Sequence, residues 1–272
     1  MIEAARGFIR KRLSPRMFGR FRFYWWLGRS HLAGLGAASS GEHAPKIYGF
    51  PDGETLQLER QLRTINAFVP TKMCRVMTWN GSDKGRYHNY TTIYSVLFGK
   101  LRNQPLRIFE LGLGTNNPQL ASTMGLSGKP GASVRGWREL FPNAVVYGAD
   151  IDRAILFEED RIKTFYCDQL DENAIRDLWS QPVLREGMDI IIDDGLHTFE
   201  ANISFLDSSL KHVRPGGVYV VEDIHTETID KWKGVLQTTY SKSFHSHEFA
   251  LVELPHSYNK NDNNLLIIRR RE

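Results

Sequence analysis

The stretch Met188 to His197, MDIIIDDGLH, decides the fold that the sequence predicts. An apolar run, Ile190 to Ile192, indicates a buried strand, and it ends abruptly at Asp193-Asp194-Gly195 before His197. In an open α/β sheet, ligands bind outside the carboxyl ends of the parallel strands. The stretch therefore predicts a strand with a functional site at its end.

A second stretch, VYVVEDIH, repeats this design from Val218 to His225. Its apolar strand is followed by Glu222-Asp223 and then by His225. Together the two strand ends carry four carboxylates and two imidazoles. Carboxylate oxygens are the ligands of hard divalent cations, so we expect the two ends to meet around such an ion.

Outward from these stretches, the chain reads as repeated strand–helix units. Strands are expected at 106–111, 144–152, 162–166, 188–193 and 218–221, and helices at 133–140, 173–179, 199–210 and 229–236. Two last strands, 249–254 and 265–269, form an antiparallel hairpin that closes one sheet edge. Residues 54–68 and the end of segment 81–98 are expected to be helical. The pattern predicts an open, doubly wound, Rossmann-like α/β sheet, mostly parallel with a C-terminal hairpin, plus a helical N-terminal extension.

A glycine pair follows the first of these strands. Gly112 and Gly114 would let a ligand approach the backbone, but Asn117 stands where a dinucleotide fingerprint has its third glycine. Asp150, at the end of the second strand, suits the ribose hydroxyls of a nucleoside, or it starts a helix. Ser133 is expected to cap the next helix. A nicotinamide dehydrogenase remains open, although the hairpin, the glycines and the carboxylates favour a nucleoside-sulfonium donor.

The charge is localised in an N-terminal arm. Residues 1–30 hold eight basic residues and one acidic residue, which gives +7, so the rest of the chain carries −3 of the total +4. Arginines alternate with aromatic residues in the arm, and a linker rich in Gly, Ser, Ala and Pro follows at 31–55. We therefore divide the chain into residues 1–50, an arm with its linker, and 51–272, a catalytic domain.

The arm has no apolar run long enough for a transmembrane span or a signal-peptide core. Its aromatic residues would pack on the body or on a second subunit, or the arm would lie on an anionic membrane surface. Nucleic acid is not expected, because the patch is small and the acidic body repels phosphate. Two distant cysteines, Cys74 and Cys167, suggest a reducing compartment, and we expect a cytoplasmic homo-oligomer, with peripheral contact at the inner face of the membrane as one option.

The order of these motifs resembles a class I S-adenosylmethionine-dependent methyltransferase. The pieces are ELGLG at 110–114, Asp150, Asp168, IIIDDG and RPGGVYVVED. Three further pieces resemble the metal-dependent sugar O-methyltransferases of macrolide and polysaccharide biosynthesis: SDKGRYHNYTTIY at 82–94, GASVRGWRELFPNAVVYGADID at 131–152, and IDDGLH with VEDIH. The likeness covers roughly residues 80–230. It departs at Leu196, where the family has a small hydroxyl residue, and in the longer loop 115–130.

The resemblance implies Mg²⁺-assisted methylation of a sugar hydroxyl in a polysaccharide or a glycosylated natural product. A cation held by Asp194, Glu222 and Asp223 would orient neighbouring hydroxyls and lower the pKa of the attacking one. His197 would then accept the proton, with His225 as the rival base. Successive strand side chains point to opposite faces, so Asp193 is expected to pair within the fold.

The resemblance also implies the donor site. The residues assigned to S-adenosylmethionine are Glu110, Gly112, Gly114, Ser133, Arg135, Asp150 and Asp168, with Lys84, His88 and Tyr90 as weaker candidates for the donor or acceptor pocket. Three other functions stay open: an NAD(P)-dependent oxidoreductase, a metal-dependent methyltransferase for catechol-like phenols, and a scaffold without turnover.

Overall fold

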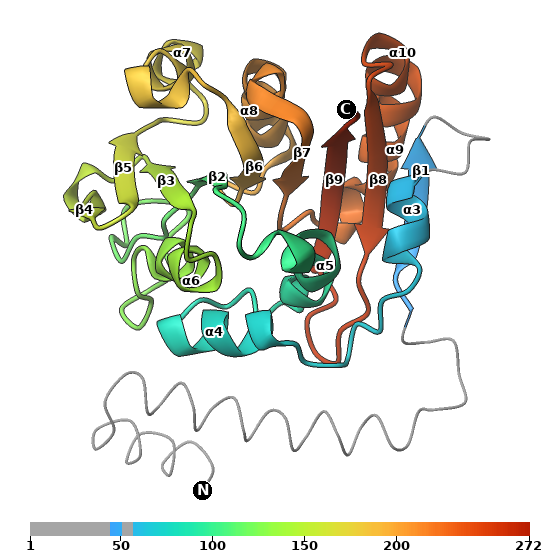
Figure 1. Ribbon diagram of the computed structural model, residues 1–272, viewed down its shortest axis with the longest axis horizontal. Coiled ribbons are helices and arrows are strands. Elements are labelled where there is room, and N and C mark those ends of the chain that lie inside the picture. The colour runs from blue at the N-terminus through green and yellow to red at the C-terminus, as the bar shows by residue number, and fades with distance from the viewer. Residues whose placement is uncertain (1–43, 51–56) are drawn as a thin grey trace, which may run out of the picture.

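The computed structural model describes residues 44–50 and 57–272, and its centre is a single sheet of nine strands (Figure 1). The strands are β1 Lys46–Phe50, β2 Arg107–Leu111, β3 Val145–Asp150, β4 Glu158–Glu159, β5 Ile162–Tyr166, β6 Met188–Asp193, β7 Val213–Val221, β8 His247–Glu253 and β9 Asn264–Arg270. Their spatial order is β1-β8-β9-β7-β6-β2-β3-β5-β4. Strands β7, β6, β2, β3 and β5 are parallel, and the other pairings are antiparallel. The predicted Rossmann-like sheet with an antiparallel hairpin is confirmed.

Helices cover both faces of the sheet and create two hydrophobic cores. One face is covered by α3 Gln57–Leu62, α4 Lys72–Asn80, α5 Tyr90–Phe98 and α6 Ala132–Leu140. The other is covered by α7 Glu172–Trp179, α8 Phe199–Ser209, α9 Ile229–Val235 and the residues before α10 Ser241–Ser243. Alternation along β6 feeds both cores, because Ile190 and Ile192 pack on the first side and Ile191 on the second. The apolar run of β6 is thus the middle layer of the fold.

Strand β1 corrects two expectations about the sheet edge. It lies within the stretch 31–55 that composition predicted to be a linker, and it pairs with β8 from Lys46↔Glu253 to Phe50↔Phe249. The β8–β9 hairpin therefore does not close the sheet, since β1 covers β8 and β9 pairs with β7. The physical reason is that an exposed edge strand has unpaired backbone groups. Strand β1 pairs with those of β8, although the two strands lie about 200 residues apart in the chain.

The N-terminal helices also differ from expectation. The helix predicted over 54–68 is described only as α3 and ends at Leu62. Beyond it, Thr64 donates a hydrogen bond to a backbone carbonyl and Asn66 accepts one from the Phe68 amide, and such local bonds compete with a helix. The unpredicted helix α4 begins at Thr71, whose hydroxyl caps the Cys74 amide. Helix α6 is capped by Gly131, not by Ser133, which lies inside the helix.

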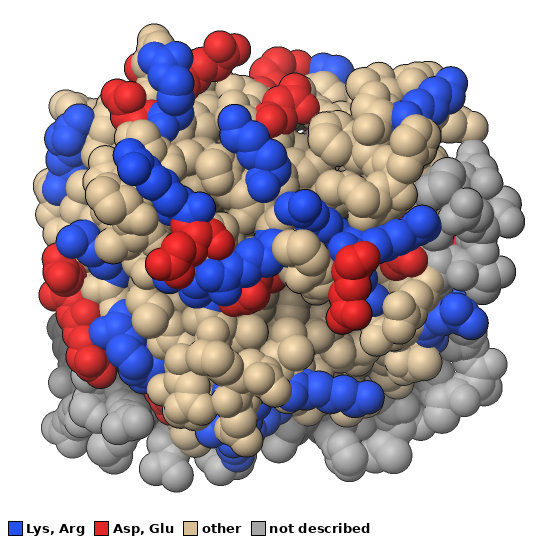
Figure 2. All heavy atoms as spheres, turned by 45° about the horizontal axis from the view of Figure 1, so that its top comes forward, with Lys and Arg blue, Asp and Glu red and all other residues tan. Residues whose placement is uncertain are grey.

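The surface and the helices bear on the expected partners. Lys and Arg side chains lie interspersed with Asp and Glu side chains on the face in Figure 2. In the described part of the chain, every helix is too short or too polar to cross a bilayer. The basic aromatic arm, residues 1–30, lies outside the described residues, so its membrane contact stays a prediction.

Candidate active site

A cavity of about 480 Å³ opens at the carboxyl ends of the parallel strands. Each strand contributes a residue at or just beyond its end: Leu111 from β2, Asp150 from β3, Cys167 from β5, Asp194 from β6 and Asp223 from β7. This is the edge at which open α/β sheets bind their ligands. The predicted meeting of the two acidic strand ends at one site is confirmed.

The glycine loop after β2 forms one wall of this cavity. Gly112 has φ +88, and a Cβ there would lie 1.8 Å from the carbonyl oxygen of Asp194, so only glycine fits. The Asp150 carboxylate accepts hydrogen bonds from the amides of Leu113, at 2.8 Å, and Asp152, at 2.9 Å. Burial raises the pKa of Asp150. Asp150 therefore fixes the loop while it also lines the cavity.

The adjacent aspartates after β6 have different partners. Asp193 is fully buried and accepts hydrogen bonds from the side-chain amides of Gln169, at 2.8 Å, and Asn202, at 3.0 Å. Burial raises the pKa of Asp193 to about 7. Asp194 faces the cavity. The prediction that Asp193 pairs within the fold is confirmed. Gln169 also accepts a hydrogen bond from the Leu196 amide at 2.8 Å, which anchors the loop after β6.

A buried lysine joins the carboxylates on the inner side of the cavity. The Nζ of Lys84 lies 2.5 Å from Asp194 and 3.5 Å from Glu110, and it also bonds Glu222. Lys84 is 1% exposed. Burial opposes its charge, but Asp194, Glu110 and Glu222 outweigh that effect and raise the pKa of Lys84 well above its usual value. The ammonium is thus a fixed cation within an acidic cluster.

His197 and Asp223 complete the outer side of the cluster. Both have a positive φ, +62 and +53, a conformation that is uncommon for residues other than glycine and is concentrated at functional sites. The Nε2 of His197 lies 3.3 Å from Asp194 and 3.4 Å from Asp223. Burial disfavours the imidazolium, but the nearby carboxylates of Asp194 and Asp223 raise the pKa of His197 to about 10.

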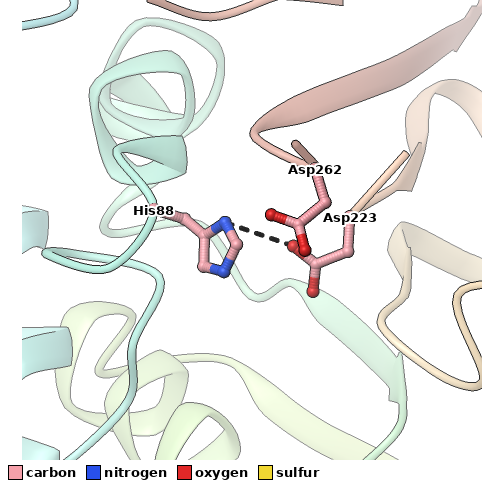
Figure 3. A group of neighbouring side chains, drawn as sticks. All are labelled: His88, Asp223 and Asp262. Carbon is pink, nitrogen blue, oxygen red and sulfur yellow. Dashed lines mark ion pairs between the residues drawn. The ribbon is translucent and has the colours of Figure 1, made fainter. Parts of the chain in front are cut away.

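Among the described residues, two groups of side chains have the spacing of metal ligands, and both include Asp223. One ligand atom from each of Asp194, His197 and Asp223 lies within 4.8 Å of the others. The second group consists of His88, Asp223 and Asp262. Figure 3 shows the His88 ring directed at the carboxylates of Asp223 and Asp262. Carboxylate oxygens from two strands fit a hard divalent cation.

Glu222, the third predicted ligand, is in neither group. Its carboxylate accepts hydrogen bonds from Lys84 and from the hydroxyl of Tyr94, and it is 1% exposed. Tyr90 similarly donates to Asp223 at 2.6 Å. The two phenols and the lysine therefore occupy oxygen atoms that the sequence assigned to a metal.

The residues assigned to the donor separate into two sets. Those that line the cavity are Gly112, Gly114, Ser133, Asp150 and Asp168. Those that do not line it are Glu110, Arg135, Lys84, His88 and Tyr90. Glu110 is fully buried and accepts hydrogen bonds from Ser133 and Trp137, and Arg135 pairs with Glu159 at 2.7 Å. These two side chains thus bond neighbouring residues and do not line the cavity.

The two candidate bases also separate. His197 lines the cavity, whereas His225 is exposed and does not. Sequence reasoning missed Gln169, Tyr94 and Asp262. Gln169 carried a signal, because it directly follows Asp168 at the end of β5, but the other two become recognisable only in three dimensions.

Comparison with proteins of known function gives several relatives, although no family model matches the chain. A rhamnosyl tetracenomycin C 2'-O-methyltransferase of Streptomyces olivaceus is 30% identical over 192 residues, which are 70% of this chain and 47% of the relative. Demethylmacrocin O-methyltransferase of Streptomyces fradiae is 35% identical over 144 residues, which are 52% of this chain and 33% of the relative. The chain thus spans less than half of each relative.

The fold has a matching relative among solved structures. The MycE methyltransferase of the mycinamycin pathway, in complex with Mg, SAH and mycinamycin VI, aligns with a TM-score of 0.55 and 25% identity over 80% of this chain and 59% of its own. Sequence relatives and structural relative are all methyltransferases by name. Sequence and fold thus agree: the chain has the fold of the class I S-adenosylmethionine-dependent methyltransferases and is similar to sugar O-methyltransferases.

Proposed function

We propose that the protein transfers a methyl group from S-adenosylmethionine to a hydroxyl of a sugar, carried by a glycosylated natural product or a polysaccharide, with the help of Mg²⁺. One observation carries the proposal: Asp194 and Asp223, from two strands, meet His197 at the edge of a cavity walled by the glycine loop. The names of two relatives support it, since they describe O-methylation of a rhamnosyl tetracenomycin C at its 2' and 3' positions.

The cavity suits the donor. We assign the methionine end to the loop of Gly112 and Gly114, the ribose to Asp150 and the adenine to the vicinity of Asp168. The oxygens of Asp150 accept backbone hydrogen bonds from Leu113 and Asp152, and a carboxylate has further lone pairs that a ribose hydroxyl can use. Ser133 lines the same cavity, next to the start of α6.

The acidic cluster suits the cation. Asp194 and Asp223 would hold it, because each directs a carboxylate oxygen into the first ligand group. Glu222 is the weaker candidate, because its two oxygens accept hydrogen bonds from Lys84 and Tyr94 and it belongs to neither ligand group. When bound, Mg²⁺ supplies a charge that orients neighbouring hydroxyls and lowers the pKa of the one that attacks.

His197 is the proposed proton acceptor. It is the imidazole beside both carboxylates, and its backbone has a positive φ that few non-glycine residues adopt. The oxygens that raise its pKa are those that would hold the cation, so cation binding and protonation of His197 compete. A neutral His197 can take the proton of the sugar hydroxyl.

Calorimetry tests the proposal against its runner-up, an NAD(P)-dependent oxidoreductase. The protein is titrated with S-adenosylhomocysteine and with NAD, each with and without Mg²⁺. We expect binding of the sulfur compound and of Mg²⁺, and none of NAD. Tight NAD binding without a response to S-adenosylhomocysteine would reject the methyltransferase proposal.

A screen with a radiolabelled methyl donor then identifies the acceptor class. Glycosides, polysaccharides and catechols are offered in parallel, because catechols share the neighbouring-hydroxyl geometry of sugars. We expect methyl uptake by a glycoside that depends on Mg²⁺. Uptake by catechols alone would support the phenol alternative.

We also propose that residues 1–30 contact an anionic membrane surface or a second copy of the chain. The support is their net charge of +7 and their interleaved aromatic residues. The arm fused to a reporter should bind anionic vesicles and release at high salt. Sedimentation of the full chain and of a chain without residues 1–30 measures self-association. If the arm binds membranes, we expect the enzyme to lie in the cytoplasm at the inner face of the membrane.

A further inference from the structure

We infer that Tyr87 and Tyr258 form a platform on which the sugar ring of the acceptor stacks. The inference rests on the proposed sugar methylation and names the subsite that would bind the acceptor. Tyr87 lies before α5 and lines the cavity, and Tyr258 lies in the loop between β8 and β9. The two side chains come from segments 171 residues apart in the sequence, and Tyr258 contacts the ring of Tyr87, which lines the cavity.

The two rings are exposed although they are large and aromatic. Tyr87 is 58% exposed and Tyr258 is 53% exposed, while their ring centroids lie 5.8 Å apart at an interplanar angle of 77°. In this edge-to-face pair the edge of one ring meets the face of the other. Exposed aromatic surface at the rim of a cavity is typical of a binding site, because folding alone would favour its burial.

The platform is held rigidly. The hydroxyl of Tyr258 donates to the carbonyl of Arg86 at 2.5 Å, and the ring of His256 packs edge-on against Tyr258 at 4.3 Å. The β8–β9 loop is joined to the start of α5 by Asn89, which donates to the Pro255 carbonyl at 3.0 Å. A ligand that stacks here therefore pays little to order its site.

A row of side chains connects the platform to the acidic cluster. The centroids of Tyr87 and His88 lie 6.2 Å apart, and the Nδ1 of His88 lies 3.2 Å from Asp223 (Figure 3). Tyr87 and Asp223 both line the cavity. A sugar ring stacked on Tyr87 would thus have its neighbouring hydroxyls on the side of Asp223, where the proposed cation and His197 lie.

The chemistry of the row favours a neutral sugar. A pyranose has a face of C–H groups, which is apolar and packs on an aromatic ring, and a rim of hydroxyls, which bind carboxylates and cations. The acidic groups beside His88 are Asp223 and Asp262, and they would repel a phosphate. The platform therefore fits an uncharged glycoside better than a sugar phosphate.

Saturation-transfer NMR on the full chain tests this inference. The protein, with S-adenosylhomocysteine and Mg²⁺, is mixed with the methyl glycosides of rhamnose, fucose, glucose and galactose at millimolar concentration. We expect saturation on the ring C–H protons of at least one glycoside. The signal should fall at least five-fold in Tyr87→Ala and Tyr258→Ala and should persist in the matched variant Tyr87→Phe, which keeps the ring.

The outcomes separate the platform from the proposed function. No saturation of any glycoside, or equal saturation in wild type and both alanine variants, overturns the platform. Calorimetry with S-adenosylhomocysteine on the same samples reports the donor site independently. Donor binding without glycoside binding would reject the platform and leave the proposed methyl transfer standing. Glycoside binding that depends on the two rings, without donor binding, would support the platform and reject the proposed methyl transfer.

Discussion

The end of β6 and the segment from Ser82 to Tyr94 meet at the same carboxylates, but they contribute opposite chemistry. The end of β6 supplies negative charge through Asp194, and its neighbour Asp193 is satisfied within the fold. The other segment supplies buried partners for the acidic cluster: the ammonium of Lys84, which pairs with Asp194, and the hydroxyl of Tyr94, which donates to Glu222.

The difference teaches how an acidic site stays folded. Parallel strands bring their carboxyl ends to one edge, so acidic residues placed there accumulate without further design. Buried carboxylates repel each other and lose their hydration, which costs several kcal/mol for each uncompensated charge. A buried cation between Glu110, Asp194 and Glu222 offsets that cost and leaves the second oxygen of Asp194 for a ligand.

The largest effect is expected from Asp194→Asn. The variant removes a carboxylate from the first ligand group, so Mg²⁺ affinity, measured by calorimetry, should fall on the order of 100-fold or more, with loss of methyl transfer. Asp193→Asn is the matched control, because Gln169 and Asn202 already occupy that carboxylate. Its Mg²⁺ affinity should stay within about three-fold of wild type. Equal losses in the two variants would remove the distinction between the aspartates.

Next in size is Lys84→Met. The methionine fills most of the space but leaves three carboxylates, two of them buried, without their cation, which should lower the free energy of unfolding by about 3–5 kcal/mol. Urea denaturation at neutral pH measures it. Lys129→Met is the control, since that lysine lines the same cavity but donates only to the carbonyl of Asn80, and its cost should stay below about 0.5 kcal/mol. Wild-type stability in Lys84→Met would show that the cluster does not need its cation.

Gly112→Ala should follow, because it forces the glycine loop away from the end of β6. The new Cβ would lie 1.8 Å from the Asp194 carbonyl at φ +88, so we expect a loss of about 2–4 kcal/mol and weaker binding of S-adenosylhomocysteine. Gly125→Ala is the control, because it introduces the same kind of backbone strain without a close contact. Its φ is +68 and nothing lies within 4 Å of the new Cβ, so only about 1 kcal/mol should be lost. Similar losses in both variants would mean that the close approach to Asp194 has no energetic role.

Local sequence patterns predicted the β6 side of this comparison well. The alternation of a strand assigned Asp193 and Asp194 to different surroundings, and the order of the strands brought Asp223 to the same edge. These features depend on the period of a strand and on the topology of a parallel sheet, both of which a single sequence expresses.

The Ser82 to Tyr94 side could not be predicted in the same way. Lys84 finds its partners 110 and 138 residues further along the chain, and its long side chain reaches them only after the fold is complete. Strand β1 depends on β8 in a similar manner. Glu110 matched a family position, but its carboxylate is turned to Ser133 and Trp137 behind the cavity, a direction that the motif ELGLG does not encode.

The smallest effect concerns acid stability away from the site. His212 stacks on Trp179 with centroids 4.4 Å apart, and burial lowers the pKa of His212 from 6.5 to about 4. As the pH falls from 6.5 to 4, the unfolded chain binds this proton before the folded protein does, so folded stability decreases in that window and is intact above it.

His212→Phe keeps the stacked ring and removes the proton site. Unfolding free energies in urea at pH 7 and pH 5 should therefore differ less in the variant than in wild type. Part of the acid sensitivity should remain, because burial also lowers the pKa of His247 and His256 to about 4. An unchanged difference between the two pH values would exclude the His212 stack as a source of acid sensitivity. The carboxylate cluster and the two other histidines would then have to account for all of it.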